Sequence, residues 1–431
     1  MLIKRPSSLP PCNSLIVSQS SQYSIERDLI SFRAIIRSSV VERMDMASSS
    51  VSAALLLAVS LAALHLCCRH GHGAGDAAGN GITAIYSLGD SITDTGNLVK
   101  EAPPGMFETI KHLPYGVTFG YPTGRCSDGL LMIDFLAQDL GLPFLNPYLG
   151  KNKSFDHGVN FAVAGATAVD PADQFNLPAV PVPFASKSLK VQLRWFKDFL
   201  KYTFGTDEEI RRRLQASLVL VGEIGGNDYN YAFFQAKPVA EVEKLIPGVV
   251  KTIVGAAKEV LDMGATRVIV PGNFPIGCVP GYLAMNAASS EPADYDSAGC
   301  LRELNDFAAK HNSRLRRAVA DLQASYPGAA VAYADYFDSF LTLLHNASSF
   351  GFDAASTRKA CCGAGAGEYN FDWRRMCGFP GTAACADPST YLSWDGIHMT
   401  QAAYRAMSRL IYHGKYLQPQ ILSFPEKNGQ T

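Results

Sequence analysis

The stretch ITAIYSLGDS, residues 82–91, joins a short apolar run to a glycine and two polar residues. The run over residues 82–88 is mostly apolar and partly β-branched, and a glycine follows it, which is typical of a short buried strand. Ser91 then stands at the turn after the strand, where an α/β enzyme holds a nucleophile. A polar turn or a helix N-cap explains the same tripeptide as well. The interpretation of Ser91 therefore depends on the partners that the rest of the chain supplies.

Apolar periodicity after this strand predicts alternating strands and helices. Strands are predicted at residues 159–163, 218–221, 267–270 and 329–333, and helices at residues 189–204, 247–261, 296–325, 336–344 and 399–413. Such alternation gives a parallel sheet covered by helices on both faces. No linker separates a second core, so residues 79–431 are predicted to form a single domain. The proline-rich stretch 171–188 is predicted to be a surface connection, with a lid or cleft wall as the alternative.

Composition limits the classes of partner. The chain has 431 residues, a formal net charge of −1 and 18% charged residues, which excludes a basic nucleic-acid-binding protein. The run Arg211-Arg212-Arg213 is flanked by Asp207, Glu208 and Glu209, so we interpret it as a solvated helix face. With 47% hydrophobic residues, the chain can bury a large core.

The N-terminal region carries targeting signals. Residues 51–66 form the only long apolar run, and small residues follow it, so a signal peptide is predicted within residues 44–78. An uncleaved anchor is the alternative, although the run is too short for a stable membrane span. Residues 1–43 are serine-rich without apolar periodicity, and we interpret them as a non-native or disordered extension. Their acidic residues argue against a transit peptide. The predicted location is secreted, in the extracellular space or cell wall.

Cysteines and sequons agree with secretion. Beyond residue 78 the chain has Cys126, Cys278, Cys300, Cys361, Cys362, Cys377 and Cys385. A secreted chain pairs most of its cysteines, and an odd number leaves at least one free or paired between chains. The four within residues 361–385 predict a loop held by disulfides. A zinc site is the competing interpretation, but CxxC pairs and nearby histidines are lacking, so no metal is predicted. Asn152 and Asn346 begin glycosylation sequons.

Four features fall at or near predicted strand ends. Ser91 follows the first strand, Gly165 the second and Asn227 the third, while Asp395 and His398 stand just before the last helix. In an open parallel sheet, ligands bind beyond the carboxyl ends of the strands. These five residues are therefore expected to lie together. Taken singly, each has a plainer interpretation: close helix packing for Gly165, a turn for Asn227 and a local helix cap for Asp395.

The blocks around these residues resemble a known family. The chain contains SLGDSITDTGN (87–97), PYGVTFGYPTGRCSDG (114–129), GEIGGNDYN (222–230), PGNFPIGC (271–278), ACCG (360–363) and YLSWDGIHMT (391–400). Gly89-Asp90-Ser91, the NFAVAGA segment (160–166), GGND (225–228) and Asp395-x-x-His398 resemble, in this order, the four blocks of the GDSL or SGNH hydrolases. The wider strings are similar to the plant GDSL esterase/lipase family, from about residue 82 to about residue 417. The resemblance implies the SGNH hydrolase fold, a three-layer α/β/α sandwich with a mainly parallel, flavodoxin-like sheet. A GxSxG elbow is absent, which argues against the α/β-hydrolase fold.

The chemistry of ester hydrolysis also predicts a role for each of these residues, independently of the resemblance. Ser91 is predicted to be the nucleophile and His398 its base, because a serine hydroxyl needs a base at neutral pH. Asp395 is predicted to orient the imidazole and stabilise its charged form. The Ser91 N–H, Gly165 and Asn227 are predicted to form the oxyanion hole. Asp90 and Asp94 receive no proton-transfer role and are expected to accept hydrogen bonds from turn and helix-start N–H groups.

These expectations combine into one functional hypothesis. The chain is predicted to be a secreted serine esterase that needs no cofactor. The resemblance implies carboxylic esters as substrates: acetylated cell-wall polysaccharide, acylated small metabolites or lipids. Two alternatives remain open, namely an acyltransferase on the same scaffold and a catalytically silent secreted carbohydrate-binding or defence protein.

Overall fold

The computed structural model describes residues 81–101, 108–171, 187–365 and 367–424. The predicted extension, the predicted signal peptide and most of the 171–188 connection lie outside the described residues. The described helices are α3 (Leu98–Glu101), α4 (Met132–Asp139), α6 (Leu189–Phe204), α7 (Asp207–Gln215), α8 (Gly226–Phe233), α9 (Val239–Val242), α10 (Ile246–Asp262), α11 (Pro280–Asn286), α12 (Arg302–Ser325), α13 (Tyr336–His345) and α14 (Gln401–Ser408). The described strands are β1 (Ala84–Leu88), β2 (Gly158–Asn160), β3 (Ser217–Val221), β4 (Arg267–Pro271), β5 (Ala330–Ala334), β6 (Cys362–Gly363), β7 (Ala383–Ala384) and β8 (Leu417–Gln418).

Six strands form the central sheet in the order β2-β1-β3-β4-β5-β8. The first five strands run parallel, with Ile85 of β1 paired to Gly158 of β2 and to Leu218 of β3, while β8 is antiparallel to β5. The order 2-1-3-4-5 is the flavodoxin-like one, in which the strand order reverses between β1 and β3. The predicted mainly parallel, flavodoxin-like sheet is confirmed. Ligand sites form beyond the carboxyl edge at this reversal.

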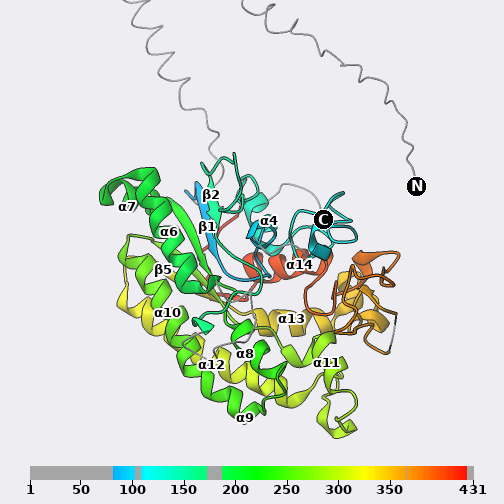
Figure 1. The fold of residues 1–431 in the computed structure, drawn as a ribbon. Coiled ribbons are helices and arrows are strands. Elements are labelled where there is room, and N and C mark those ends of the chain that lie inside the picture. Colours follow the sequence, from blue (N-terminus) through cyan, green and yellow to red (C-terminus); the bar gives the residue numbers. More distant parts are fainter. Residues whose placement is uncertain (1–80, 102–107, 172–186, 366, 425–431) are drawn as a thin grey trace, which may run out of the picture. The chain divides into compact units, whose positions relative to one another are not determined.

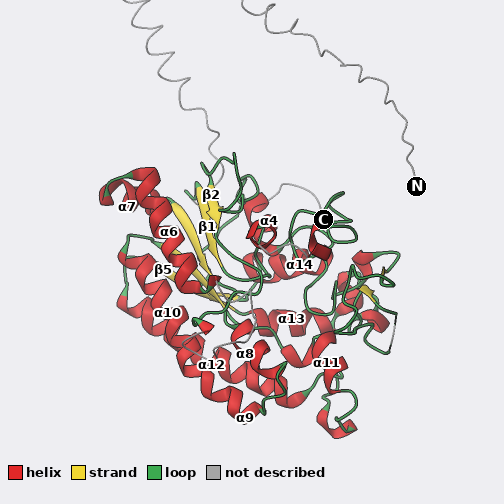
Figure 2. Ribbon diagram, in the orientation of Figure 1, coloured by secondary structure: helices red, strands yellow, loops and turns green. Residues whose placement is uncertain are grey.

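The two faces of the sheet pack against different helices. Alternate residues of a strand point to opposite faces, so Tyr86 and its equivalents pack with α6, α10 and α12, whereas Ile85 and its equivalents pack with α4, α13 and α14. Figure 2 shows the strands between these two groups of helices. Both Tyr86 and Ile85 are fully buried, which agrees with a sheet covered on both sides. The molecule is therefore the predicted three-layer α/β/α sandwich.

Several predicted boundaries are confirmed and others are wrong. The helix predicted at residues 189–204 is α6 without change. The long helix predicted from residue 296 begins only at residue 302, because a disulfide ties Cys300 to Cys278 and the Leu301 N–H donates to the Gly277 carbonyl at 2.9 Å. The last helix is α-helical over residues 401–408 and continues as a π-helix over residues 409–413.

The disulfides form as the cysteine distribution predicts. Cys278 pairs with Cys300, Cys361 with Cys385 and Cys362 with Cys377, which leaves Cys126 unpaired and buried within the described chain. Two of these bonds hold the loop between residues 361 and 385, and the short strands β6 and β7 pair inside it. No helix in the described ranges is both long and apolar enough to cross a membrane.

Candidate active site

Ser91 follows β1 at the carboxyl edge of the sheet, in a turn that is tightly held. The side chain of Gln192, from α6, makes two hydrogen bonds with the backbone of Gly89. Its oxygen accepts from the Gly89 N–H at 2.8 Å, and its amide donates to the Gly89 carbonyl at 2.8 Å. The Asp90 N–H donates to the Glu223 carbonyl after β3 at 3.0 Å. The turn is thus bound from two neighbouring elements, which fixes the position of the Ser91 hydroxyl.

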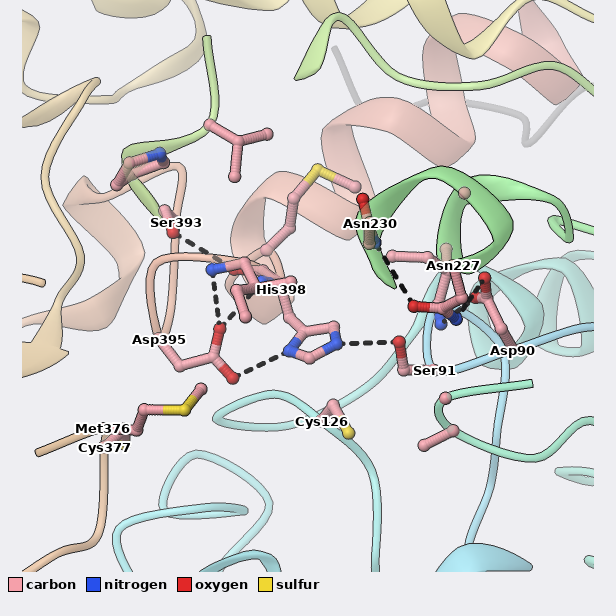
Figure 3. A pocket seen from close by; sticks show the side chains of 18 of the residues that line it. Asp90, Ser91, Cys126, Asn227, Asn230, Met376, Cys377, Ser393, Asp395 and His398 are labelled. Atoms are coloured by element: carbon pink, nitrogen blue, oxygen red, sulfur yellow. Dashed lines mark hydrogen bonds and ion pairs between the residues drawn. The ribbon is translucent and has the colours of Figure 1, made fainter. Parts of the chain in front are cut away.

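Three predicted site residues form one hydrogen-bonded line (Figure 3). The Ser91 hydroxyl donates to Nε2 of His398 at 2.8 Å, and Nδ1 of His398 donates to Oδ2 of Asp395 at 2.8 Å. Ser91 and His398 are 307 residues apart in the chain. This is the geometry in which an imidazole can take the serine proton while a carboxylate holds its tautomer.

The turn from Asp395 to His398 shapes this arrangement. Oδ1 of Asp395 accepts from the N–H groups of Ile397 at 3.0 Å and His398 at 2.8 Å and so closes the turn. The plainer interpretation of Asp395 as a helix cap is wrong, because α14 begins only at Gln401 and Thr400 caps it. Gly396 between them has φ +92°, and a Cβ there would lie 2.2 Å from the Phe371 ring, so only glycine fits. One carboxylate oxygen closes the turn, and the other remains for the imidazole.

Tyr115 is a further partner of this carboxylate that sequence reasoning missed. Its buried hydroxyl donates to Oδ2 of Asp395 at 2.8 Å, the same oxygen that His398 contacts. Its ring packs edge-on against the buried Trp394 at a centroid distance of 6.0 Å. Tyr115 stands in one of the blocks that carry the family resemblance, but it is 280 residues from Asp395, so no spacing pointed to the contact.

The ion pair determines the charge state of these groups. Burial works to raise the pKa of Asp395, but the charge and hydrogen bond of His398, with the two turn N–H groups, outweigh it and leave that pKa lowered. Burial works to lower the pKa of His398, but Asp395 outweighs it and leaves that pKa raised. Asp395 is therefore a carboxylate, and it favours the imidazolium that forms when His398 takes a proton.

Two predicted oxyanion donors lie beside Ser91. Gly165 has φ +82°, a conformation that favours glycine, and its carbonyl accepts the Tyr231 hydroxyl at 2.6 Å. The Asn227 amide donates to the Ala166 carbonyl at 2.9 Å and to Oδ2 of Asp90 at 3.3 Å, while its oxygen accepts from Asn230 at 3.2 Å. The side chain of Asn227 is thus held in one orientation, and the long contact to Asp90 is the weakest of its three bonds.

A second pair of acidic side chains lies on this side of Ser91. Burial raises the pKa of Asp90 to about 7 and raises that of Glu223 well above its usual range, and the neighbouring Asp90 charge raises the pKa of Glu223 further. Neighbouring carboxyl groups disfavour each other's charged form. The expected backbone contacts are also present: Asp90 accepts from the Ile92 N–H at 3.0 Å, and Asp94 accepts from Gly96 and Asn97 at 2.7 and 2.6 Å.

Ser91 and His398 open onto a cavity of about 860 Å³. Its lining includes Gly165, Asn227 and Asp395 together with residues of α8, α11 and the disulfide-held loop. Cys126 also lines it and stands below the His398 ring in Figure 3, where burial raises the pKa of its thiol well above the usual range. Ser91 is the better candidate nucleophile, because its hydroxyl is hydrogen-bonded to Nε2 of His398, which can take its proton.

The structure therefore brings together five of the seven predicted site residues. Ser91, Gly165, Asn227, Asp395 and His398 all line the cavity, whereas the predicted glycosylation residues Asn152 and Asn346 are exposed elsewhere. Across the described ranges, no cluster of three or more histidine, cysteine, aspartate or glutamate side chains could hold a metal ion. Besides Tyr115, sequence reasoning missed Glu223, which stands in the GEIGGNDYN block but has no pattern that marks a buried carboxyl pair.

Comparisons with known proteins agree with this geometry. The model of the GDSL-like lipase/acylhydrolase family matches residues 85–411. Acetylajmalan esterase 2 of Rauvolfia serpentina is 44% identical over 79% of this chain and 90% of its own length. A GDSL esterase/lipase of Arabidopsis thaliana is 45% identical over 78% of this chain and 83% of its own length.

Among solved structures, a phospholipase A1 of Streptomyces albidoflavus aligns with a TM-score of 0.33 and 14% identity, over 76% of this chain and 97% of that one. The order of the central sheet and the family match establish the fold of this chain. The chain belongs to the GDSL-like lipase/acylhydrolase family, among the plant GDSL esterase/lipases, and it is a carboxylic ester hydrolase.

Proposed function

We propose that this protein is a secreted serine esterase that acts through a Ser91–His398–Asp395 triad and an acyl-enzyme. The observation that carries the proposal is the unbroken line of two hydrogen bonds, each 2.8 Å, from the Ser91 hydroxyl to the Asp395 carboxylate. Its reactive end faces a cavity of about 860 Å³, large enough for an ester substrate.

Acylation begins when Oγ of Ser91 attacks the ester carbonyl carbon and its proton passes to Nε2 of His398. The carbonyl oxygen becomes an oxyanion that the N–H groups of Ser91 and Gly165 and the amide of Asn227 stabilise. For this, the Asn227 amide exchanges its 3.3 Å contact with Asp90 for a closer one with the oxyanion. The C–O bond of the ester then breaks, and His398 returns the proton to the departing alcohol.

Deacylation repeats these steps with water. A water molecule gives a proton to His398 and attacks the acyl carbon, and the same donors hold the second oxyanion. The bond to Oγ of Ser91 breaks, the carboxylic acid leaves, and Ser91 regains its proton.

Secretion and the substrate class are parts of the same proposal. The three disulfides and the exposed sequon residues Asn152 and Asn346 suit an oxidising, extracellular compartment. Among the three predicted substrate classes, we favour acylated small metabolites, because relatives about 44% identical are named acetylajmalan esterases. Acetylated polysaccharide and lipid esters are the comparison substrates.

The test is hydrolysis of 4-nitrophenyl acetate by the purified protein and by Ser91→Ala. Loss of the nucleophile is expected to lower kcat by at least about 1000-fold. The control Ser87→Ala removes a buried hydroxyl of β1, the strand before Ser91; this hydroxyl is hydrogen-bonded to Thr93 and not to His398. Undiminished hydrolysis by Ser91→Ala, or no ester hydrolysis by the wild type, would overturn the proposed function.

A further inference from the structure

Three aromatic side chains form one wall of the cavity. Phe234 at the end of α8 and Trp373 in the disulfide-held loop meet edge-to-face at a centroid distance of 4.4 Å, and both line the cavity. Each keeps 38% of its surface exposed, which is unusual for large apolar side chains in contact with each other. Phe379, from the same loop, is 47% exposed and lines the cavity as well.

Both halves of this wall are connected by side-chain contacts to the predicted catalytic region. Phe371 packs edge-on against Trp373 at 5.0 Å and lies against Gly396, inside the Asp395–His398 turn. On the other side, Phe234 contacts Tyr282 at 6.0 Å. A short network therefore joins each half of the wall to the predicted catalytic groups, so the wall keeps a fixed position relative to Ser91.

The polar groups beside the wall are already engaged with one another. The Tyr282 hydroxyl donates to Oδ1 of Asn230 at 2.5 Å, and the Asn230 amide donates to Asn227 at 3.2 Å. The Tyr231 hydroxyl donates to the Gly165 carbonyl. Among the described residues that line the cavity there is no lysine or arginine. Few hydrogen-bond donors are free here to bind a sugar or an anionic headgroup, so burying such a group would cost free energy. An apolar group needs no hydrogen bonds and does not carry this cost.

We propose that Phe234 and Trp373 form a subsite for a flat, apolar ring of the ester substrate. Aromatic rings bind one another edge-to-face or offset, and two half-exposed faces at a fixed angle can hold such a ring. The inference rests on the proposed function, and it specifies the substrate class as esters that carry an aromatic or fused-ring group. Trp373 and Phe234 then determine specificity, and the disulfides Cys362–Cys377 and Cys361–Cys385 keep Trp373 in place.

The first experiment measures kcat/KM for 1-naphthyl acetate and for ethyl acetate, which lacks a ring. Trp373→Ala is expected to lower the ratio of the two constants about tenfold, mainly through KM for the naphthyl ester, and Trp373→Phe to restore most of it. Phe350→Ala is the matched control, because Phe350 is 39% exposed and is not among the cavity-lining residues. Methyl 1-naphthoate, with the ring on the acyl side, identifies which half of the ester the wall binds.

If Trp373→Ala leaves the ratio of the two kcat/KM values unchanged, whether or not both values fall, the proposed subsite is contradicted. A second measurement separates this result from failure of the proposed function. The Kd of 1-acetonaphthone, a ketone with the same ring that cannot be hydrolysed, is measured by calorimetry on Ser91→Ala. Ser91→Ala/Trp373→Ala is expected to bind it about tenfold more weakly. Equal binding by the two proteins would refute the aromatic subsite even if ester hydrolysis is confirmed.

Discussion

Two buried aspartates lie on opposite sides of the Ser91–His398 pair, and their chemistry differs. Asp395 is 2% exposed and Asp90 is 3% exposed, so burial penalises their charged forms similarly. Asp395 faces an imidazole and two turn N–H groups, and its pKa is lowered. Asp90 lies beside the carboxyl of Glu223 and has no imidazole of the described residues hydrogen-bonded to it, so burial prevails and raises its pKa to about 7.

The difference shows that the partner, and not the depth of burial, decides which carboxyl group works as a charge. Asp395 stays ionised and can stabilise a positive imidazolium. The Asp90 carboxyl accepts from the Asn227 amide, and the Asp90 N–H donates to the Glu223 backbone carbonyl, so Asp90 supports the Ser91 turn through hydrogen bonds. Acid groups with such different environments can have separate roles in one site.

The largest expected effect follows Asp395→Asn. An asparagine amide would donate to Nδ1 of His398, which leaves the proton on Nε2 and removes the base from Ser91. We expect kcat to fall by about 10⁴-fold, as judged from the general behaviour of such triads. The measurement is ester hydrolysis at pH 7 to 8. In contrast, Asp90→Asn keeps an acceptor for the Ile92 N–H and is expected to cost at most about tenfold. Equal losses in the two variants would remove the distinction.

Glu223→Ala should have the next largest effect, on stability. It opens a cavity and leaves the carboxylate of Asp90 buried without its acidic partner. We expect the free energy of unfolding to fall by about 2–4 kcal/mol, measured by urea denaturation. Glu223→Gln, which keeps the size and supplies an N–H donor to Asp90, is the control and should stay within about 1 kcal/mol of wild type. A loss in Glu223→Gln as large as in Glu223→Ala would argue against this role of Glu223 beside Asp90.

Tyr115→Phe tests the Asp395 side with a smaller change. The variant removes a hydroxyl that donates to Oδ2 of Asp395 but keeps the ring against Trp394. The carboxylate loses one neutral donor, so it should attract the imidazolium more strongly and raise the pKa of His398 further. We expect kcat/KM to fall about three- to tenfold and its acid limb to move to higher pH. A limb that moves to lower pH would contradict this role.

The smallest effect concerns the pH dependence of stability. A raised folded-state pKa stabilises the protein below the unfolded value, about 3.9 for aspartate, and this stabilisation is lost as pH rises through the folded value. For Asp90 the loss spans about pH 4 to about pH 7. Glu223→Gln should lose less, because the raised pKa of Glu223 adds a second loss of the same sign in the wild type, and an amide does not titrate. The Tm of Glu223→Gln relative to wild type is therefore expected to increase between pH 5 and pH 8.

The contribution of Asp395 to stability depends on pH in the opposite direction. Its lowered pKa contributes stability above about pH 3.9, and that contribution is lost as pH falls through the folded value. The Tm deficit of Asp395→Asn should thus be constant at neutral pH and shrink in acid. Scanning calorimetry of both variants over the same buffers makes the comparison direct. If the Tm deficits of Glu223→Gln and Asp395→Asn, each relative to wild type, change with pH in the same direction, the proposed difference between Asp90 and Asp395 is wrong.

Local sequence signals were sufficient for much of the fold. The apolar run before Gly89, the periodicity of residues 189–204 and the small residues around Gly165 each act within a few residues, so a pattern reveals them. The same holds for the Asp395–His398 turn, because its carboxylate-to-backbone bonds and its glycine are local. Boundaries failed where distant contacts intervene, as at residues 296–301, where the bond from Cys300 to Cys278 competes with the helix.

The sequence alone predicted a parallel sheet covered by helices, because strand and helix periodicity are local. Its resemblance to the family blocks implied the flavodoxin-like sheet, and the same blocks together with the predicted strand ends indicated the five residues that line the cavity. Only the tertiary structure decided their partners. Tyr115 reaches Asp395 across 280 residues, Glu223 meets Asp90, and Trp373 meets Phe234. Such contacts depend on how separate elements pack, and packing also determines burial, pKa values and the walls of the cavity. Patterns of residues along the chain do not predict the distances between side chains of separate elements.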